Sequence, residues 1–164
     1  MDIIEQLMVE HAALRLHFHF AREKNFDAIY ELEEFVRTCH ARIEDELVFP
    51  KLEASIPRSL KDTVGKDLSR LESDHKLIEK IGDQIRARTV EGDAETLAKR
   101  VLLYINTVES HNAGEESLIF PYWRASEAEE HEVKSGAWKV IQSFGLNRYF
   151  AITGFSEKLA ETMR

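Results

Sequence analysis

The sequence predicts an all-α protein, an antiparallel up-down four-helix bundle with a short helical C-terminal extension. Three observations lead to this fold class. Glycine (7) and proline (3) are scarce among the 164 residues, so turn signals are few and the elements are expected to be long. Apolar residues recur at helical 3-4 spacing in four successive segments. No segment shows the clear alternation of apolar and polar residues that indicates a half-buried strand.

Capping residues and breaks divide the chain into five predicted helices. They cover residues 2–22, 28–49, 57–89, 94–120 and 127–143. The residues expected to cap or open them are Asp2, Asp27, Pro57, Asp93 and Ser126. Glutamates three residues after Asp2 and Ser126 complete capping-box patterns. Pro50 and Pro121 are expected to end the second and fourth helices, because the residue before a proline is biased away from helix. Short turns are expected at 24–26 and 91–93.

The length suffices for one domain with one sizeable core. We expect residues 1–123 to form the four-helix bundle and residues 124–164 to form the C-terminal extension packed on it. Gly145 should end the fifth helix, and a turn and a short last helix should follow it.

The composition is that of a folded, soluble protein, with 43% hydrophobic and 32% charged residues. The net charge of −8 and the lack of a Lys/Arg cluster predict no nucleic-acid partner. The longest apolar runs, such as Val101–Ile105, are too short to span a bilayer, so no membrane partner is expected. The single Cys39 excludes an internal disulfide, and the acidic N-terminus is not the basic start of a signal peptide. Both features predict a cytoplasmic protein, and a homodimer is left open.

Each of the four apolar stripes contains one histidine, in order His11, His40, His75 and His111. A buried imidazole is costly unless it is hydrogen-bonded or bound. Counted from the predicted helix ends, the histidines of neighbouring helices differ in depth by at most ~4.5 Å along the axis. The four rings are therefore expected to converge on one point.

Two carboxylates complete this predicted site. Glu44 and Glu115 each follow a histidine by four residues, a spacing that places both side chains on one helix face. The segments HARIEDELVFP, from His40, and HNAGEESLIFP, from His111, share His, Glu, Leu, Phe and Pro at matching places. This repeat predicts two related helix pairs around a pseudo-twofold axis, which suits two metal ions bridged by two carboxylates. Imidazole and carboxylate ligands suit iron, manganese or zinc, with iron favoured where open positions handle dioxygen.

This pattern resembles the haemerythrin-like, or HHE cation-binding, family over residues 1 to about 123. The matching residues are His11, His40, Glu44, His75, His111 and Glu115. The resemblance implies that the first two histidines hold one iron, that the last two hold the other, and that both glutamates bridge them.

The oxygen-carrying members of the family have a further histidine where this chain has Glu79. The chain therefore resembles the iron-cluster repair and iron-sensing branches more than the oxygen carriers. Glu79 is either a seventh metal ligand or part of a solvated bundle edge. As a ligand it would add negative charge, which favours a resting ferric centre bridged by oxo or hydroxo.

The predicted function is that of a diiron protein that binds or reacts with a small diatomic ligand, dioxygen or nitric oxide, or that handles or senses iron. A ferritin-like oxidase or ferroxidase is an alternative. Such sites use Glu-x-x-His on two helices, and only Glu72 with His75 fits that motif. A structural metal module in a larger complex is a third class. Whether the protein is an enzyme stays open at this stage.

Several other residues carry weaker expectations. His17, His19 and His131 are expected at the surface, and Cys39 is expected to be a buried or half-buried thiol rather than a redox switch. Tyr104 is either a core residue or a hydrogen-bond partner for a bound ligand. The mid-helix Gly114 either leaves room for a small molecule or permits close helix packing.

Overall fold

The computed structural model describes residues 1–23, 27–88 and 94–156, and every regular element within these ranges is helical. The α-helices are α1 (Ile3–Arg22), α2 (Asp27–Phe35), α3 (Ala41–Ile43), α4 (Phe49–Ser55), α5 (Lys61–Arg88), α6 (Ala94–Gly114), α7 (Glu127–Phe144) and α8 (Leu146–Thr153). Three π-helical turns are η1 (Val36–His40), η2 (Glu44–Val48) and η4 (Glu115–Ile119), and two 3₁₀ turns are η3 (Arg58–Leu60) and η5 (Phe120–Tyr122). The predicted all-α class is confirmed.

The second helical run continues through Pro50, so the predicted end near Phe49 is wrong. The run extends without a break from α2 through η1, α3 and η2 to the end of α4 at Ser55. Pro50 lies in the first turn of α4, directly after the π-helical turn η2. The missing N–H of a proline is tolerated in such a first turn, and the wider π turn before it changes the hydrogen-bond register. The helical run therefore continues through Pro50 without ending.

The fourth helical run ends close to its predicted limit. α6 is followed by η4 and η5, and the run ends at Tyr122, just after Pro121. The third helix begins slightly later than predicted. Pro57 precedes the 3₁₀ turn η3, and α5 starts at Lys61. Residues 24–26 and 89–93, with the predicted turns and the Asp93 cap, lie outside the described residues, as does the side chain of Asp27.

Both predicted capping boxes are confirmed. The Glu5 amide donates to Asp2 Oδ1 at 2.8 Å, and the Asp2 amide donates to Glu5 Oε2 at 2.9 Å. Ser126 opens α7 in the same way with Glu129. The predicted end of α7 at Gly145 is also confirmed, since this glycine has a φ of 112°, a conformation that side chains with a Cβ rarely adopt.

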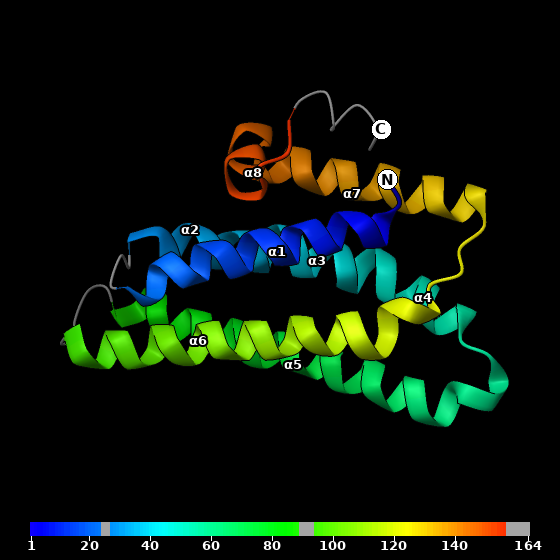
Figure 1. Ribbon diagram of the computed structural model, residues 1–164, viewed down its shortest axis with the longest axis horizontal. Coiled ribbons are helices and arrows are strands. Elements are labelled where there is room, and N and C mark those ends of the chain that lie inside the picture. The colour runs from blue at the N-terminus through cyan, green and yellow to red at the C-terminus, as the bar shows by residue number, and fades with distance from the viewer. Residues whose placement is uncertain (24–26, 89–93, 157–164) are drawn as a thin grey trace.

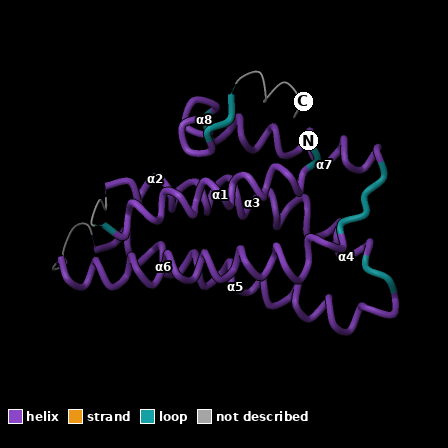
Figure 2. The backbone as a smooth tube through the Cα atoms, in the orientation of Figure 1, coloured by secondary structure: helices purple, strands orange, loops and turns teal. Residues whose placement is uncertain are grey.

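The helices form three layers (Figure 1). α1 and the run α2–α4 make the middle layer, α5 and α6 make a second layer, and α7 and α8 lie on the outer side of α1 and α3. α7 contacts α1, η1, α3 and η2, and α8 contacts α1. Figure 2 shows the loops that join α4 to η3 and α5, and η5 to α7. The C-terminal helices therefore cover the first half of the bundle, and no described helix lies on the outer side of α5 and α6.

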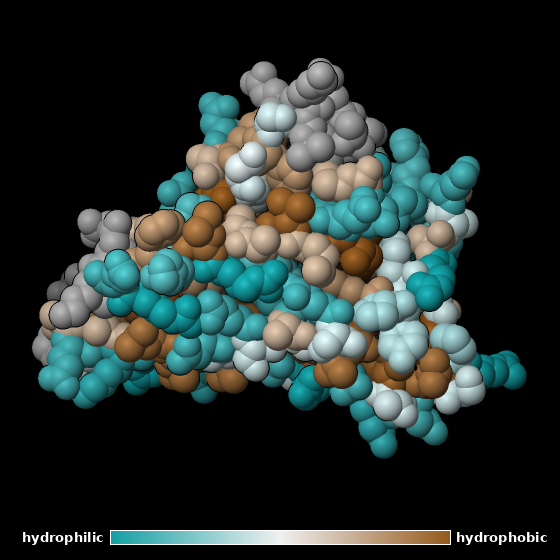
Figure 3. Space-filling model, in the orientation of Figure 1, coloured by the Kyte–Doolittle hydropathy of each residue, from teal (hydrophilic) through white to brown (hydrophobic). Residues whose placement is uncertain are grey.

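The four predicted apolar stripes face one core. Leu7, Leu32, Leu68 and Val108 represent the four helical runs, and each is at most 2% exposed. Polar residues cover much of the face seen in Figure 3, with apolar residues scattered among them. Among the described residues, no helix is long and apolar enough to cross a membrane.

Candidate metal centre

The four stripe histidines meet in the centre of the bundle, as the sequence predicts. His11, His40, His75 and His111 are at most 8% exposed. The Nε2 atoms of His11 and His40 lie 3.1 Å apart, and the ring centroids of His75 and His111 lie 4.4 Å apart. The rings therefore form two pairs, one from α1 and η1 and the other from α5 and α6.

Glu44 lies between the two pairs. Its Oε1 atom lies 3.7 Å from His11 Nε2 and 3.4 Å from His40 Nε2. Its Oε2 atom lies 3.3 Å from His75 Nε2. One carboxylate thus reaches both histidine pairs.

Glu115 takes the corresponding place from the other side. Its Oε1 atom lies 3.1 Å from His111 Nε2, and its Oε2 atom lies 3.4 Å from His11 Nε2. Both glutamates are fully buried. Two groups of four potential metal ligands result, each with its ligand atoms within 4.8 Å of one another. The groups are His11, His40, Glu44, Glu115 and Glu44, His75, His111, Glu115.

The polar atoms of this cluster lack ordinary partners. Within the described residues, both carboxylate oxygens of Glu44 and of Glu115, and the Nε2 atoms of His75 and His111, are buried without a hydrogen bond. Leaving such atoms unsatisfied typically costs ~1–3 kcal/mol each, and more when they are charged. Buried charges in proteins are paired or coordinate metals. The imidazole and carboxylate donors therefore fit a pair of metal ions that both glutamates contact.

A further carboxylate lies on the Nδ1 side of each histidine, and three of the four histidines are hydrogen-bonded to it. His11 donates to Glu116 at 2.9 Å, His40 to Glu10 at 2.8 Å and His75 to Asp45 at 2.8 Å. The matching distance from His111 Nδ1 to Asp74 Oδ2 is 3.9 Å, too long for a hydrogen bond. A proton held on Nδ1 leaves Nε2 as the lone-pair donor that a metal needs.

These four outer carboxylates follow the pseudo-twofold relation of the sequence repeat. An acid directly precedes His11 and His75, and an acid directly follows Glu44 and Glu115. The sequence pattern alone did not predict a functional role for these acids. The signal was present in the pairs Glu10-His11, Asp74-His75, Glu44-Asp45 and Glu115-Glu116, but only the fold shows which histidine each acid meets.

The same relation extends to the walls and the backbone of the site. Phe120 stacks on His11 with centroids 5.7 Å apart, and Phe49 stacks on His75 at 5.6 Å. Both phenylalanines occupy the same place in the repeat. The π-helical turns η2 and η4 begin at the two central glutamates. Such turns often occur at functional sites in helices, where they change the direction of a side chain.

The charges of the metal-free cluster are strongly coupled. Burial opposes ionisation, but the neighbouring histidines hold the pKa of Glu44 well below its ordinary value. Burial also opposes protonation of His75, but the hydrogen bond to Asp45 and the nearby negative charge of Glu44 raise its pKa to about 10. In the same way, Glu115, Glu116 and Glu44 raise the pKa of His11. Protons and metal ions would therefore compete for the same Nε2 atoms.

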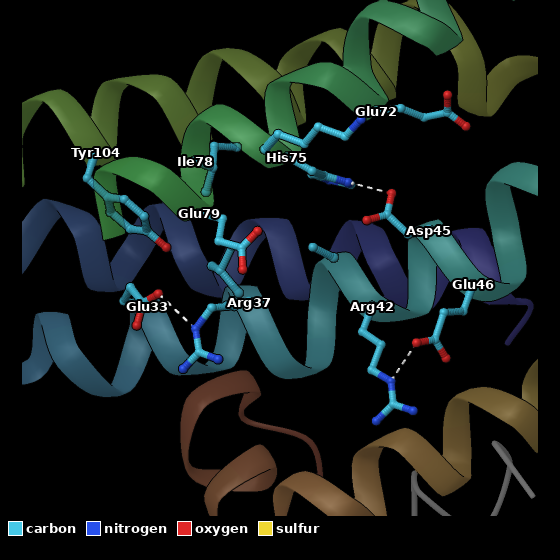
Figure 4. Close-up of a pocket in the computed structure, with 13 residues that line it drawn as sticks. Glu33, Arg37, Arg42, Asp45, Glu46, Glu72, His75, Ile78, Glu79 and Tyr104 are labelled. Carbon is cyan, nitrogen blue, oxygen red and sulfur yellow. Dashed lines mark hydrogen bonds and ion pairs between the residues drawn. The ribbon is translucent and has the colours of Figure 1, made fainter. Parts of the chain in front are cut away.

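Glu79 lies outside both groups of potential ligands. Its side chain is exposed and lines a cavity of about 510 Å³ that also reaches His75 and Tyr104. In Figure 4, the Glu79 carboxylate projects towards Arg37, whereas the His75 ring turns to Asp45. The structure therefore brings six of the seven predicted ligands together, and metal ligation by Glu79 stays a prediction.

The remaining sequence expectations have mixed outcomes. Tyr104 is a core residue, 1% exposed, and no described residue forms a hydrogen bond with its hydroxyl. A Cβ at Gly114 would lie 3.1 Å from Leu71 Cδ2, which favours the close-packing interpretation. His17 is half-buried, because α8 covers it and its Nε2 lies 2.9 Å from the Ile152 carbonyl oxygen. The surface prediction for His17 is therefore wrong.

The expectations for the other two histidines and the cysteine are confirmed. His19 and His131 are exposed. Cys39 is a buried free thiol, and burial raises its pKa. A thiol held in its protonated form is a poor nucleophile, which argues against a redox switch.

Comparisons with known proteins agree with this site. Three mycobacterial relatives, uncharacterized proteins Mb2018 of Mycobacterium bovis and MT2051 and Rv1995 of Mycobacterium tuberculosis, are each 30% identical to the chain over 99 residues. The match covers 57% of this chain and 36% of each relative, so it spans only about a third of their length. No solved structure matches the chain significantly. The model of the hemerythrin HHE cation binding domain matches residues 2–123, which include all six clustered histidine and glutamate residues. The chain therefore belongs to the hemerythrin HHE cation-binding domain family.

Proposed function

We propose that this protein holds two iron ions between the helices of an antiparallel up-down four-helix bundle. His11 and His40 would bind one ion, His75 and His111 would bind the other, and Glu44 and Glu115 would bridge them. The observation that carries this proposal is that two groups of four buried ligands share both glutamates. Residues that belong to both groups are suited to bridging.

The charges of the chain support the same assignment. Two ferrous ions bring four positive charges, and the two bridging carboxylates offset two of them. The outer carboxylates add further negative charge behind the histidines, and hydrogen bonds from the Nδ1 atoms transmit part of it to the ligands. Mixed imidazole and carboxylate donors suit iron, and they also accept manganese or zinc. Two iron ions are therefore the proposed cofactor, and a metal analysis decides the identity.

We further propose that the centre binds or reacts with a small diatomic ligand, dioxygen or nitric oxide, or that it handles or senses iron. Iron bound at this site would supply coordination positions for such a ligand. The chain itself would hold the metals, exclude bulk water and supply hydrogen bonds. The cavity of about 510 Å³ beside His75 supports access from solvent. Phe49 and Phe120 line the two ends of the cluster and hold the rings in place.

The alternative of a ferritin-like oxidase has less support. Glu72, the one residue that fits the Glu-x-x-His motif, is exposed and lies outside both groups of potential ligands. A structural metal module in a larger complex is the other alternative, and the partial coverage of the relatives is compatible with it. Three further points stay predictions. They are that the protein acts in the cytoplasm, that the bundle and the extension divide between residues 123 and 124, and that the protein forms a homodimer.

The test is metal analysis of protein purified without oxygen and loaded with ferrous iron. We expect two iron ions per chain. Ferrous protein exposed to dioxygen or nitric oxide should then develop new visible absorption. Glu115→Gln should lower the iron content, whereas Glu127→Gln, an exposed substitution at the start of α7, should leave it unchanged. One tightly bound zinc per chain, or no metal after iron loading, would contradict the proposal.

A further inference from the structure

The C-terminal extension places a tyrosine behind the metal centre. Tyr149 lies on α8, beyond the residues that match the family, and its side chain is 0% exposed. Its hydroxyl donates to Glu10 Oε1 at 2.6 Å. Glu10 lies next to His11 on α1, 139 positions earlier in the chain. This contact joins the extension to the bundle at the depth of the metal ligands.

Glu10 connects Tyr149 to a metal ligand. Its Oε1 atom accepts from Tyr149 and, at 3.0 Å, from Gln6 Nε2. Its Oε2 atom accepts from His40 Nδ1 at 2.8 Å. Tyr149, Gln6, Glu10 and His40 are each at most 2% exposed. A buried chain of hydrogen bonds thus runs from α8 to the back of the His40 ring.

The other half of the bundle lacks this arrangement. The pseudo-twofold counterparts of Glu10 and His40 are Asp74 and His111, and their closest N–O distance is 3.9 Å. The side chain of Asp74 is 35% exposed, against 0% for Glu10. A solvent-facing hollow of about 270 Å³ lies beside Asp74 and His111. α7 and α8 cover the first half of the bundle. The two otherwise similar metal positions therefore differ in the burial of the outer carboxylate and in its hydrogen bond to the histidine Nδ1 atom.

We propose that Tyr149 is a positioning residue that fixes Glu10 against His40 and so makes the His11–His40 position hold its metal more firmly than the His75–His111 position. A carboxylate that accepts from Nδ1 orients the imidazole and raises its basicity at Nε2. Tyr149 acts by keeping that carboxylate in one orientation. The inference rests on the proposed function, since it concerns how firmly each metal is held.

The experiment compares Tyr149→Phe with the wild type in the rate of ferrous iron release to a chelator, without oxygen. The wild type should release its two ions in two phases. Removal of an outer partner of a metal ligand typically weakens metal binding 10- to 100-fold, so we expect the slow phase of Tyr149→Phe to speed up by about 10-fold. Asp45→Asn removes the acceptor of the His75 Nδ1 proton and should speed up the other phase only. Tyr104→Phe is the matched control, because Tyr104 is similarly buried and its hydroxyl has no partner in the part of the chain that the structure describes.

A double-variant cycle shows whether Tyr149 acts through Glu10. Glu10→Gln alone should speed up the slow phase, and Tyr149→Phe should add nothing in that background. If Tyr149→Phe does not fold, Gln6→Leu removes the other donor to Glu10 Oε1 and should speed up the same phase. Equal acceleration of both phases, or none, would overturn the inference, as would full additivity in the double variant.

Metal-free protein provides a readout that does not depend on iron. In nitrogen-15 spectra of the wild type, the His40 Nδ1 proton should exchange slowly with water because Glu10 holds it. Tyr149→Phe should make this exchange faster, whereas Tyr104→Phe should not. A wild type that binds no iron would refute the proposed function, and this exchange rate would still decide the role of Tyr149. An unchanged rate in Tyr149→Phe would overturn it.

Discussion

Removal of iron should lower the thermal stability of the fold by a large and calculable amount. The six proposed ligands come from α1, from the run α2–α4, from α5 and from the run α6–η4, so only the folded chain brings them together. A ligand that binds only the folded state stabilises it by about 2.7 kcal/mol when its free concentration is 100 times its dissociation constant. Two such ions would contribute roughly 5 kcal/mol.

That free energy corresponds to a shift in melting temperature of roughly 10–20 °C for a chain of this size. The assay is calorimetry of the iron-loaded protein before and after treatment with a chelator, without oxygen. His111→Ala removes a ligand and should abolish most of the shift. His131→Ala removes an exposed histidine and should leave the shift intact. Superimposable melting curves of the loaded and chelated protein would refute the argument that metal joins the four helical runs.

Three further predictions test the charges and the packing around the site. Glu79→His removes one negative charge beside His75 and should slow autoxidation of the diferrous protein; equal rates would show that Glu79 does not set its redox behaviour. The pKa of His75 is raised to about 10 in the folded metal-free chain. Its protonated ring therefore stabilises the metal-free fold fully below about pH 6.5, and this stabilisation is lost as the pH rises through about 10. Ferrous iron, which needs an unprotonated Nε2, should therefore bind with release of protons at pH 7, and a pH-stat titration without proton release would contradict this. Gly65→Ala should stabilise the helix by about 1 kcal/mol, because its Cβ would meet no atom within 4 Å. Gly114→Ala should stabilise the protein less, or destabilise it, because its Cβ would press on Leu71. Equal unfolding midpoints of the two variants in urea would argue against close packing at Gly114.

The sequence was sufficient to predict the main helices and the convergence of six candidate metal-binding residues, because both follow from periodic spacing. Histidine and glutamate four residues apart must share a helix face, and one histidine in each stripe must point to the core. Glu79 shares the i+4 spacing with His75, yet it lies on the exposed side of α5. The i+4 spacing places a residue near one face of the helix, but a small rotation of the helix about its axis decides whether the side chain reaches the metal centre.

Other features depend on contacts that local patterns do not contain. The continuation of the helix through Pro50 depends on the π-helical turn η2, and sequence periodicity does not reveal such a turn. The half-burial of His17 and the contact of Tyr149 with Glu10 both depend on how α8 packs against α1. These contacts join residues more than 130 positions apart. They arise from tertiary packing of the extension, which no cap or stripe specifies.

The outer carboxylates also constrain how the site could be divided. Asp45, from the first helix pair, holds His75 of the second, and Glu116, from the second pair, holds His11 of the first. Each helix pair thus supplies an acid that accepts a hydrogen bond from a histidine of the other pair. Neither pair contains all the acids that its own histidines need. A lone pair of this kind could build the same centre only by associating with a second copy about a true dyad. Two fragments of this chain, separated at the loop before α5, should therefore regain metal binding only when they are mixed.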